Sequence, residues 1–310
     1  MVTAILKPTL RSAAHELARV SGLSRLRAQR LGRARILMYH SVTDPQLFAA
    51  QLTFLRRHFE LIGLRELADR ISRRELRGRE VVITFDDGVK NHYTNAYPVL
   101  QRHAAPATFF VCPALIEAQQ WIWNMELRAR LQSLEAFELL GLADELSGPA
   151  AEVEAVIEWA KGLEMGERQA VAELVRSRTP RFRPTPAQID LCAPLSWTEL
   201  QALDPGIVTI GSHTMTHPIL PTLTSAQAAL EIVDSRRVLE SKLDRVVDSF
   251  CYPNGSHVPE VVRLVERAYD CAVTTEAAFT WNDSERHRLP RIPAGETRGL
   301  FEWRLHRPLA

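Results

Sequence analysis

Short apolar runs alternate with helical segments along most of this chain, and this alternation limits the folds that it can adopt. The apolar runs cover residues 35–42, 81–85, 105–112, 206–214, 249–253, 271–275 and 288–292. The clearest helical pattern between them covers residues 225–244. Strands that alternate with helices form parallel βα units, in either an open sheet or a barrel. The sequence has no G-x-G-x-x-G or G-x-x-x-x-G-K-[ST] pattern, so no nucleotide-binding motif supports the open sheet.

One long region interrupts the alternation. Residues 117–195 have a mostly helical pattern and end in a proline-rich segment. This predicts a helical insertion between two strands. Insertions of this kind usually shape a substrate groove or an oligomer contact.

The composition is that of one large globular α/β domain. The 310 residues are 46% hydrophobic and 24% charged, which is enough apolar material for a large core. No stretch of eighteen apolar residues occurs, so we expect no transmembrane helix. The cysteines have no C-x-x-C spacing and are predicted to be reduced thiols. They are Cys112, Cys192, Cys251 and Cys271.

The N-terminal segment, residues 1–34, is predicted to be a basic helical region ahead of one large domain at 35–310. The net charge of the chain is only +1, but residues 1–35 carry eight basic residues and one acidic residue, which gives +7. The spacing of Leu17, Val20, Leu23, Leu26 and Leu31 indicates an amphipathic helix. We favour a helix that packs on the domain, and the alternative is peripheral contact with an anionic membrane surface.

The same segment indicates where the protein acts and what it does not bind. It lacks the apolar core and the cleavage site of a secretory signal, so a cytoplasmic location is expected, with membrane association as the alternative. Its basic run is terminal and lacks interleaved aromatic residues, so no nucleic-acid partner is expected.

Two motifs follow apolar runs at the positions where functional side chains collect in parallel α/β folds. Asp86 and Asp87 come directly after the run 81–85, and His213 and His217 are four residues apart after 206–214. On a helical turn, this spacing places both rings on one face. Two imidazoles and one carboxylate can hold a divalent metal ion and leave positions open for water and substrate. The second carboxylate can then act as a general base.

The motifs TFDDG (84–88) and SHTMTH (212–217) resemble the first two motifs of the polysaccharide deacetylase family, which is also called the NodB-homology or carbohydrate esterase 4 family. The resemblance covers roughly residues 35–293 without the insertion. It implies a distorted (β/α)7-type barrel, with the helical insertion between the first and second metal motifs. It also implies that Asp86 is the general base and that Asp87, His213 and His217 bind a divalent metal, usually zinc.

The third motif, FCYPNG (250–255), departs from the R-x-P-Y form that is commonest in the family, because Cys251 stands where the arginine would fall. It is similar to the F-x-YP-x-G form of the branch that contains poly-N-acetylglucosamine deacetylases. This similarity implies that the backbone N–H of Asn254 is an oxyanion donor, and that Tyr252 and Pro253 belong to the substrate-binding site. We expect Cys251 to be a packing residue and not a nucleophile.

Two residues are predicted to replace missing family side chains. Arg291, in the segment LPRI, is the candidate to orient Asp86 and is also a substrate-binding candidate; the alternative is a surface salt bridge. The usual fifth motif, L-x-H, reads Leu289-Pro290-Arg291 and has no histidine. His40, in MYHSV, resembles the first-strand histidine that serves as the general acid in the same branch. Its alternative role is structural.

The predicted function is metal-dependent hydrolysis of the N-acetyl group of an aminosugar, in a polysaccharide or a surface-glycan precursor. The partner is therefore a carbohydrate. One alternative with the same chemistry is a deformylase or an O-acetyl esterase that acts on a lipid-linked or small sugar. Another, from a different class, is a catalytically inactive glycan-binding protein. The four intact residues Asp86, Asp87, His213 and His217 speak against inactivity.

Overall fold

The centre of the molecule is one parallel sheet. The computed structural model describes residues 3–30, 32–146 and 150–307. The strands are β1 (Arg35–Tyr39), β2 (Glu60–Leu61), β3 (Glu80–Phe85), β4 (Ala107–Val111), β5 (Val208–Ser212), β6 (Ser249–Cys251), β7 (Cys271–Val273) and β8 (Ile292–Pro293). Their order is β7-β6-β5-β4-β3-β1-β8, and β2 pairs with β3 off this path. All these pairings are parallel, as the alternation of strands and helices predicts.

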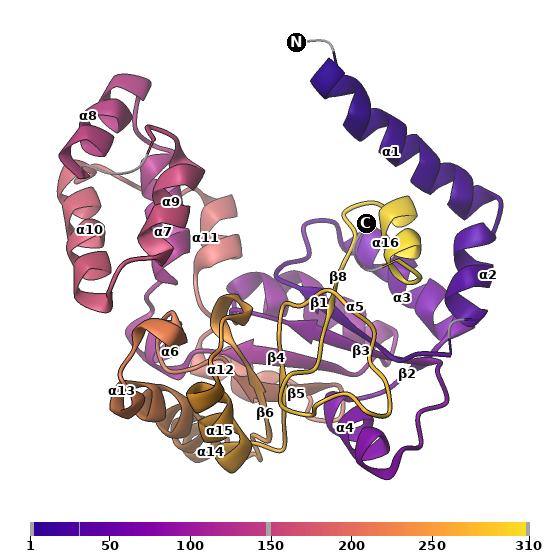
Figure 1. Cartoon of the computed structure of the whole chain (residues 1–310). Helices are drawn as coiled ribbons and strands as arrows, with labels where there is room; N and C mark the ends of the chain where they lie inside the picture. Colours follow the sequence, from indigo (N-terminus) through magenta and orange to yellow (C-terminus); the bar gives the residue numbers. More distant parts are fainter. Residues whose placement is uncertain (1–2, 31, 147–149, 308–310) are drawn as a thin grey trace.

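The sheet curves until its two ends meet, so the predicted distorted (β/α)7-type barrel is confirmed. β8 pairs with β1 through Leu37 and Ile292. Just before β8, Leu289 forms a parallel bridge with Val273 of β7. The segment that contains Leu289 and β8 therefore joins the first and last strands of the ring. Helices surround the barrel (Figure 1).

Alternate strand residues face two different environments. Ile83, Phe85 and Phe109 belong to the cluster that packs under the surrounding helices. Val82 and Phe110 belong to a second cluster on the other face of the strands. Because successive strand side chains point to opposite faces, Thr84 and Asp86 share the phase of Val82. This places Asp86 toward the barrel interior.

Nine α-helices lie around the barrel within the described ranges. They are α3 (Pro45–His58), α4 (Leu64–Arg73), α5 (Tyr97–Arg102), α6 (Pro113–Ala118), α12 (Trp197–Ala202), α13 (Ser225–Ala229), α14 (Ser235–Leu243), α15 (Pro259–Ala268) and α16 (Arg298–Arg304). Two π-helical turns are η1 (His92–Ala96) and η3 (Leu230–Asp234), and two 3₁₀ turns are η2 (Leu220–Thr222) and η4 (Pro253–Gly255). The helix predicted over 225–244 is therefore interrupted by the π-turn η3.

The region predicted as an insertion forms a helical lobe beside the barrel rim (Figure 1). Its helices are α7 (Trp123–Leu131), α8 (Ala136–Leu146), α9 (Val153–Lys161), α10 (Met165–Arg178) and α11 (Pro186–Cys192). Leu127, Val156, Ile157 and Val175 are buried in an apolar cluster that is separate from the clusters of the barrel. The lobe thus has a small core of its own.

The basic N-terminal segment forms two helices, α1 (Thr3–Val20) and α2 (Leu23–Arg30). The chain changes direction between them at Gly22, whose φ of 73° suits a residue without a side chain. The ring of His15 lies 5.0 Å from that of Trp303 in α16, so α1 packs on the domain as favoured above. Leu31 lies outside the described residues.

Two further predictions concern the whole chain. None of the helices within the described ranges has the length and apolar character needed to span a bilayer. All four cysteines are free, as their spacing predicts.

Candidate metal centre and active site

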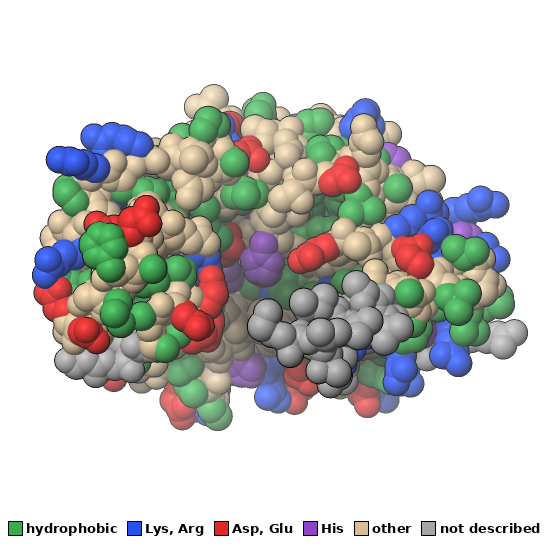
Figure 2. Space-filling model, turned by 90° about the horizontal axis from the view of Figure 1, so that it is seen from above, with side chains coloured by type: hydrophobic (Ala, Val, Ile, Leu, Met, Phe, Trp, Pro, Cys, Tyr) green, Lys and Arg blue, Asp and Glu red, His purple; other side chains and the backbone are tan. Residues whose placement is uncertain are grey.

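Three candidate metal ligands lie close together at the carboxyl ends of β3 and β5: Asp87, His213 and His217. In the sheet, β4 lies between β3 and β5. The Nε2 atoms of both histidines lie 3.5 Å from Oδ1 of Asp87, and all three side chains are buried. Three ligand atoms about 2.1 Å from one ion at tetrahedral angles are about 3.4 Å apart. The spacing therefore fits one small divalent ion. Figure 2 shows histidine side chains in a hollow on this face.

The two histidines lie on a loop and not on a helix, so the helical turn considered for the four-residue spacing is wrong. Thr214 and His217 have φ values of 70° and 58°, in the left-handed region that residues other than glycine rarely adopt. The Thr214 hydroxyl accepts a hydrogen bond from the His217 N–H. The turn brings the ring centroids of His213 and His217 to 4.8 Å. Such strained backbone is typical of functional sites.

Hydrogen bonds around the loop hold the histidines in place. Nδ1 of His213 donates to the carbonyl oxygen of Cys251 at 2.7 Å, so Nε2 is the nitrogen that faces Asp87. Glu231, in η3, accepts from the N–H groups of Met215 and Thr216 and from the Thr216 hydroxyl. Sequence reasoning missed Glu231, because its only signal was one acidic residue in a helical segment.

The protonation of these residues follows from burial and charge. Burial lowers the pKa of His217 to about 4, so its imidazole is neutral near pH 7, the form that coordinates metals. Burial alone would raise the pKa of Asp87, but its hydrogen bond with His213 and the charges of the nearby histidines hold that pKa below its usual value. Burial alone would lower the pKa of His213, but Cys251 and the carboxylates of Asp87 and Asp86 raise it, so a metal that binds here would displace a proton from this ring. Two imidazoles and one carboxylate form a donor set that suits a divalent metal.

Asp86 makes a buried, two-pronged ion pair with Arg291. Nη1 and Nη2 of Arg291 each lie 2.6 Å from a carboxylate oxygen of Asp86. Arg291 also donates to the Thr84 hydroxyl and to the Thr274 carbonyl oxygen. Burial would raise the pKa of Asp86, but the charge and hydrogen bonds of Arg291 outweigh burial and lower it. Asp86 is therefore held as a carboxylate in one orientation.

Complete burial of Arg291 bears on the alternatives predicted for it. A residue with no exposed surface does not form a surface salt bridge. Its guanidinium is also surrounded by protein groups, which is at odds with a direct contact to substrate. The geometry fits the orienting role toward Asp86.

His40 follows β1 and stands at the edge of the same group. Its Nε2 lies 3.9 Å from Oδ2 of Asp86, and 55% of its side chain is exposed. The His40 carbonyl oxygen lies 2.9 Å from Nε2 of His92, a buried residue between Phe85 and Phe109. His40 thus has the position of a residue that can reach both Asp86 and a bound substrate.

The third motif divides into buried side chains and one free backbone group. Tyr252 has no exposed surface, and its hydroxyl donates to the His287 carbonyl oxygen. Pro253 is also buried. This packing is at odds with the substrate contacts predicted for the two side chains. Asn254 has φ 54° and, within the described part of the chain, no acceptor pairs with its backbone N–H.

The fold and the site together define a class of protein, namely a parallel (β/α) barrel with a carboxylate–histidine metal site at its carboxyl rim. The chain belongs to the polysaccharide deacetylase family. The family model, described as polysaccharide deacetylase, matches residues 73–140 and 187–271. These two segments leave out residues 141–186, which contain most of the helical lobe.

Individual relatives agree with this assignment. The chain is 32% identical over 100 residues to the poly-beta-1,6-N-acetyl-D-glucosamine N-deacetylase of Staphylococcus epidermidis, and this match covers 32% of the chain and 34% of that protein. Among solved structures, IcaB from Ammonifex degensii is similar with a TM-score of 0.58 and 17% identity, over 88% of this chain and 97% of the other. The Streptococcus pyogenes deacetylase PplD in complex with acetate has a TM-score of 0.57 and 20% identity, over 84% and 92%. These two likenesses show the shared fold.

Proposed function

We propose that this protein is a metal-dependent deacetylase that hydrolyses the N-acetyl group of an aminosugar in a polysaccharide or a surface-glycan precursor. The observation that carries the proposal is the convergence of Asp87, His213 and His217 beside the Asp86–Arg291 pair. All four residues that such a site needs are present, which favours an enzyme over a glycan-binding protein without activity. They are Asp86, Asp87, His213 and His217. The catalytic domain that we propose is residues 35–310, with 1–34 as a separate helical segment.

The residues have distinct proposed roles. Asp87, His213 and His217 would hold the metal, which we propose to be zinc because two nitrogen ligands and one oxygen ligand suit it. A bound divalent ion supplies a polarised acyl carbonyl and an acidified water. Asp86 takes a proton from the attacking water, and Arg291 keeps the Asp86 carboxylate aligned. The two adjacent acids therefore have different partners: Asp86 pairs with Arg291, and Asp87 lies beside the two histidines.

Two groups complete the proposed reaction. The free N–H of Asn254 donates to the negative charge that develops on the acyl oxygen. His40 gives a proton to the nitrogen of the leaving amine, and its exposure leaves it accessible to a bound sugar. Expulsion of an amine needs this proton, because an unprotonated amine anion is a poor leaving group.

Acetate release from N-acetylated aminosugar oligomers tests the proposed function. We expect turnover with the N-acetyl substrate, loss of turnover after chelation, and recovery when zinc is added back. N-formyl and O-acetyl substrates in the same assay distinguish the deformylase and esterase alternatives. Glycan binding without release of any acyl group, with every divalent metal supplied, would contradict the proposal and favour the inactive binding protein.

His40→Ala is expected to lower turnover of an amide substrate by about 10²–10⁴-fold and turnover of an activated ester much less. The reason is that the leaving group of such an ester needs no proton. Parallel kinetics with both substrates check this. His257→Ala is the control, because the His257 side chain bonds the nearby Gly255 carbonyl oxygen and packs on the ring of Tyr252. Equal losses with both substrates would remove His40 from the general-acid role.

We also propose that α1 and α2 contact an anionic membrane surface. Leu17 and Val20 are 72% and 73% exposed, and Leu23 and Leu26 are also exposed. Exposed arginines share these helices, and each basic side chain near an anionic bilayer contributes about 1 kcal/mol. They include Arg11, Arg25 and Arg27. The four apolar side chains named above stay exposed although α1 packs on α16.

Co-sedimentation with lipid vesicles tests this contact. We expect binding to phosphatidylcholine vesicles that contain phosphatidylserine and little binding to phosphatidylcholine alone, because the attraction depends on anionic lipid. Replacing Leu17 and Leu23 by serine should weaken binding. If sedimentation is the same with and without phosphatidylserine, and the same for the wild type and the serine variant, the helices serve only to pack on the domain.

A further inference from the structure

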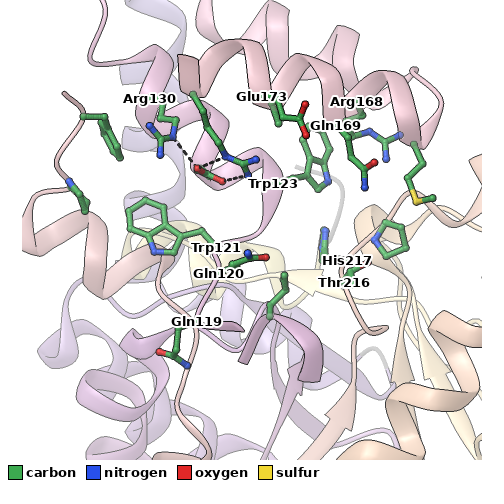
Figure 3. Close-up of a pocket in the computed structure, with 18 of the residues that line it drawn as sticks. Gln119, Gln120, Trp121, Trp123, Arg130, Arg168, Gln169, Glu173, Thr216 and His217 are labelled. Carbon is green, nitrogen blue, oxygen red and sulfur yellow. Dashed lines mark hydrogen bonds and ion pairs between the residues drawn. The ribbon is translucent and has the colours of Figure 1, made fainter. Parts of the chain in front are cut away.

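A cavity of about 790 Å³ lies between the helical lobe and the barrel rim, and His217 is part of its wall. Its remaining walls come from the connection between α6 and α7, from α7 and α10, and from the chain around Phe182 (Figure 3). Because His217 is also a candidate metal ligand, the cavity begins at the reactive centre and extends under the lobe. A volume of this size is in the upper part of the range for ligand-binding sites.

The aromatic rings of the cavity differ in how far they are already occupied. Phe182 is covered by the guanidinium of Arg130, 4.9 Å from its ring centroid. Trp123 packs against the apolar cluster of the lobe and lies under Arg168. Trp121 is half-buried and belongs to none of the apolar clusters formed by the described residues. Its indole is therefore the ring that can stack on a ligand.

Free amide groups face the same space. Figure 3 shows Gln169 and Glu173 above the cavity, and Trp121 with Gln120 on the side of the barrel. Within the described ranges, the side chains of Gln120 and Gln169 make no hydrogen bond with protein, and both line the cavity. An amide both donates and accepts, which matches the hydroxyl and acetamido groups of a sugar.

The arginines of the cavity are engaged by protein groups. Arg130 and Arg176 both pair with the carboxylate of Glu126. The guanidinium of Arg168 donates to the carbonyl oxygens of Ala160 and Leu163. A phosphate or a uronic acid would need an accessible cation without a carboxylate partner, whereas Arg168 is buried. The open part of the wall is thus aromatic and polar, and it includes the exposed carboxylate of Glu173, which disfavours an anionic ligand.

From these observations we infer that the cavity binds neutral sugar residues next to the residue that loses its acetyl group. The protein therefore acts on a neutral oligosaccharide or polysaccharide chain in preference to a single sugar. Trp121 stacks on a sugar ring, and Gln120 and Gln169 bond its hydroxyl or acetamido groups. This inference rests on the proposed deacetylase function. It assigns a substrate-binding role to Gln169 of α10, a helix outside the segments that the family model matches.

Comparison of a neutral N-acetylated tetrasaccharide with the corresponding monosaccharide tests the inference. Trp121→Ala is expected to lower kcat/KM for the tetrasaccharide by about tenfold, since loss of a stacked ring costs about 1 kcal/mol or more. Turnover of the monosaccharide should stay within about twofold, because the metal site is unchanged. Gln169→Ala, at an exposed position without protein hydrogen bonds, should shift the same ratio in the same direction.

Trp281→Ala is the matched control, because Trp281 is an exposed tryptophan that does not line the cavity. It should leave both substrates unchanged. Equal effects of Trp121→Ala on both substrates, no effect on either, or faster turnover of an anionic tetrasaccharide would overturn the inference.

Calorimetric binding separates this result from failure of the proposed function. If the wild-type protein releases no acetate, the neutral tetrasaccharide should still bind, and Trp121→Ala should weaken its binding by about tenfold. Absence of tetrasaccharide binding to the wild-type protein would then reject the cavity as a sugar site. Acetate release from the monosaccharide with no preference for the longer chain would reject the inference and leave the deacetylase function in place.

Discussion

Asp86→Asn is expected to lower kcat by about 10²–10⁴-fold while the protein keeps its metal. Asparagine has nearly the same shape as aspartate, but it cannot take a proton from water. Asp86 bonds Arg291 and lies outside the Asp87–His213–His217 group, so the substitution should not empty the metal site. Acetate release and metal content per chain, measured on the same preparation, check this.

Asp87→Asn is the matched variant, with the same chemical change one residue along the chain. It should lose metal itself, because a carboxylate ligand is replaced by a neutral amide, and activity should recover in part at high metal concentration. The two assignments would be refuted if both variants kept equal metal and equal activity.

Arg291→Met is expected to lower the free energy of unfolding by about 3–5 kcal/mol and to remove most activity. The substitution leaves the buried Asp86 carboxylate without its opposite charge and without the two hydrogen bonds from Arg291. Arg291→Lys should recover little activity, because one ammonium group cannot reproduce the two parallel bonds of a guanidinium. Urea unfolding and steady-state kinetics measure the two effects.

The double variant Asp86→Asn with Arg291→Met isolates the ion pair. The loss in free energy of unfolding for the double variant should be smaller than the sum of the losses for the two single variants. The reason is that the double variant contains no buried charge without a partner. Arg65→Met is the surface control: Arg65 bonds Asp248 at an exposed site, and its loss should cost less than about 1 kcal/mol. Strict additivity of the Asp86 and Arg291 changes would show that the pair is not coupled.

Strand positions and the grouping of the candidate metal ligands could be predicted because each depends on local sequence. An apolar run followed by an acidic pair or by H-x-x-x-H identifies a strand and the functional end of that strand without knowledge of the rest of the chain. The period of two also places Asp86 on the interior side. These features need only the chemistry of neighbouring residues.

Contacts between distant segments could be predicted only in part. Arg291 was a candidate partner for Asp86, but its complete burial and its bonds to Thr84 and Thr274 depend on how the barrel closes. The same closure buries Tyr252, whose motif position suggested contact with substrate. The left-handed residues Thr214 and His217 were missed because neither is glycine, and their loop depends on the remote Glu231.

Closure of the barrel by Leu289 and β8 has a consequence for when activity can arise. Arg291 lies between the Leu289 bridge and β8, near the end of the chain, whereas Asp86 lies in its first third. During synthesis, the proposed metal ligands leave the ribosome before the segment that holds Asp86 in place. A chain shortened before residue 291 would therefore keep its proposed metal ligands and lack the partner of Asp86, so the proposed hydrolysis would depend on docking of the last strand.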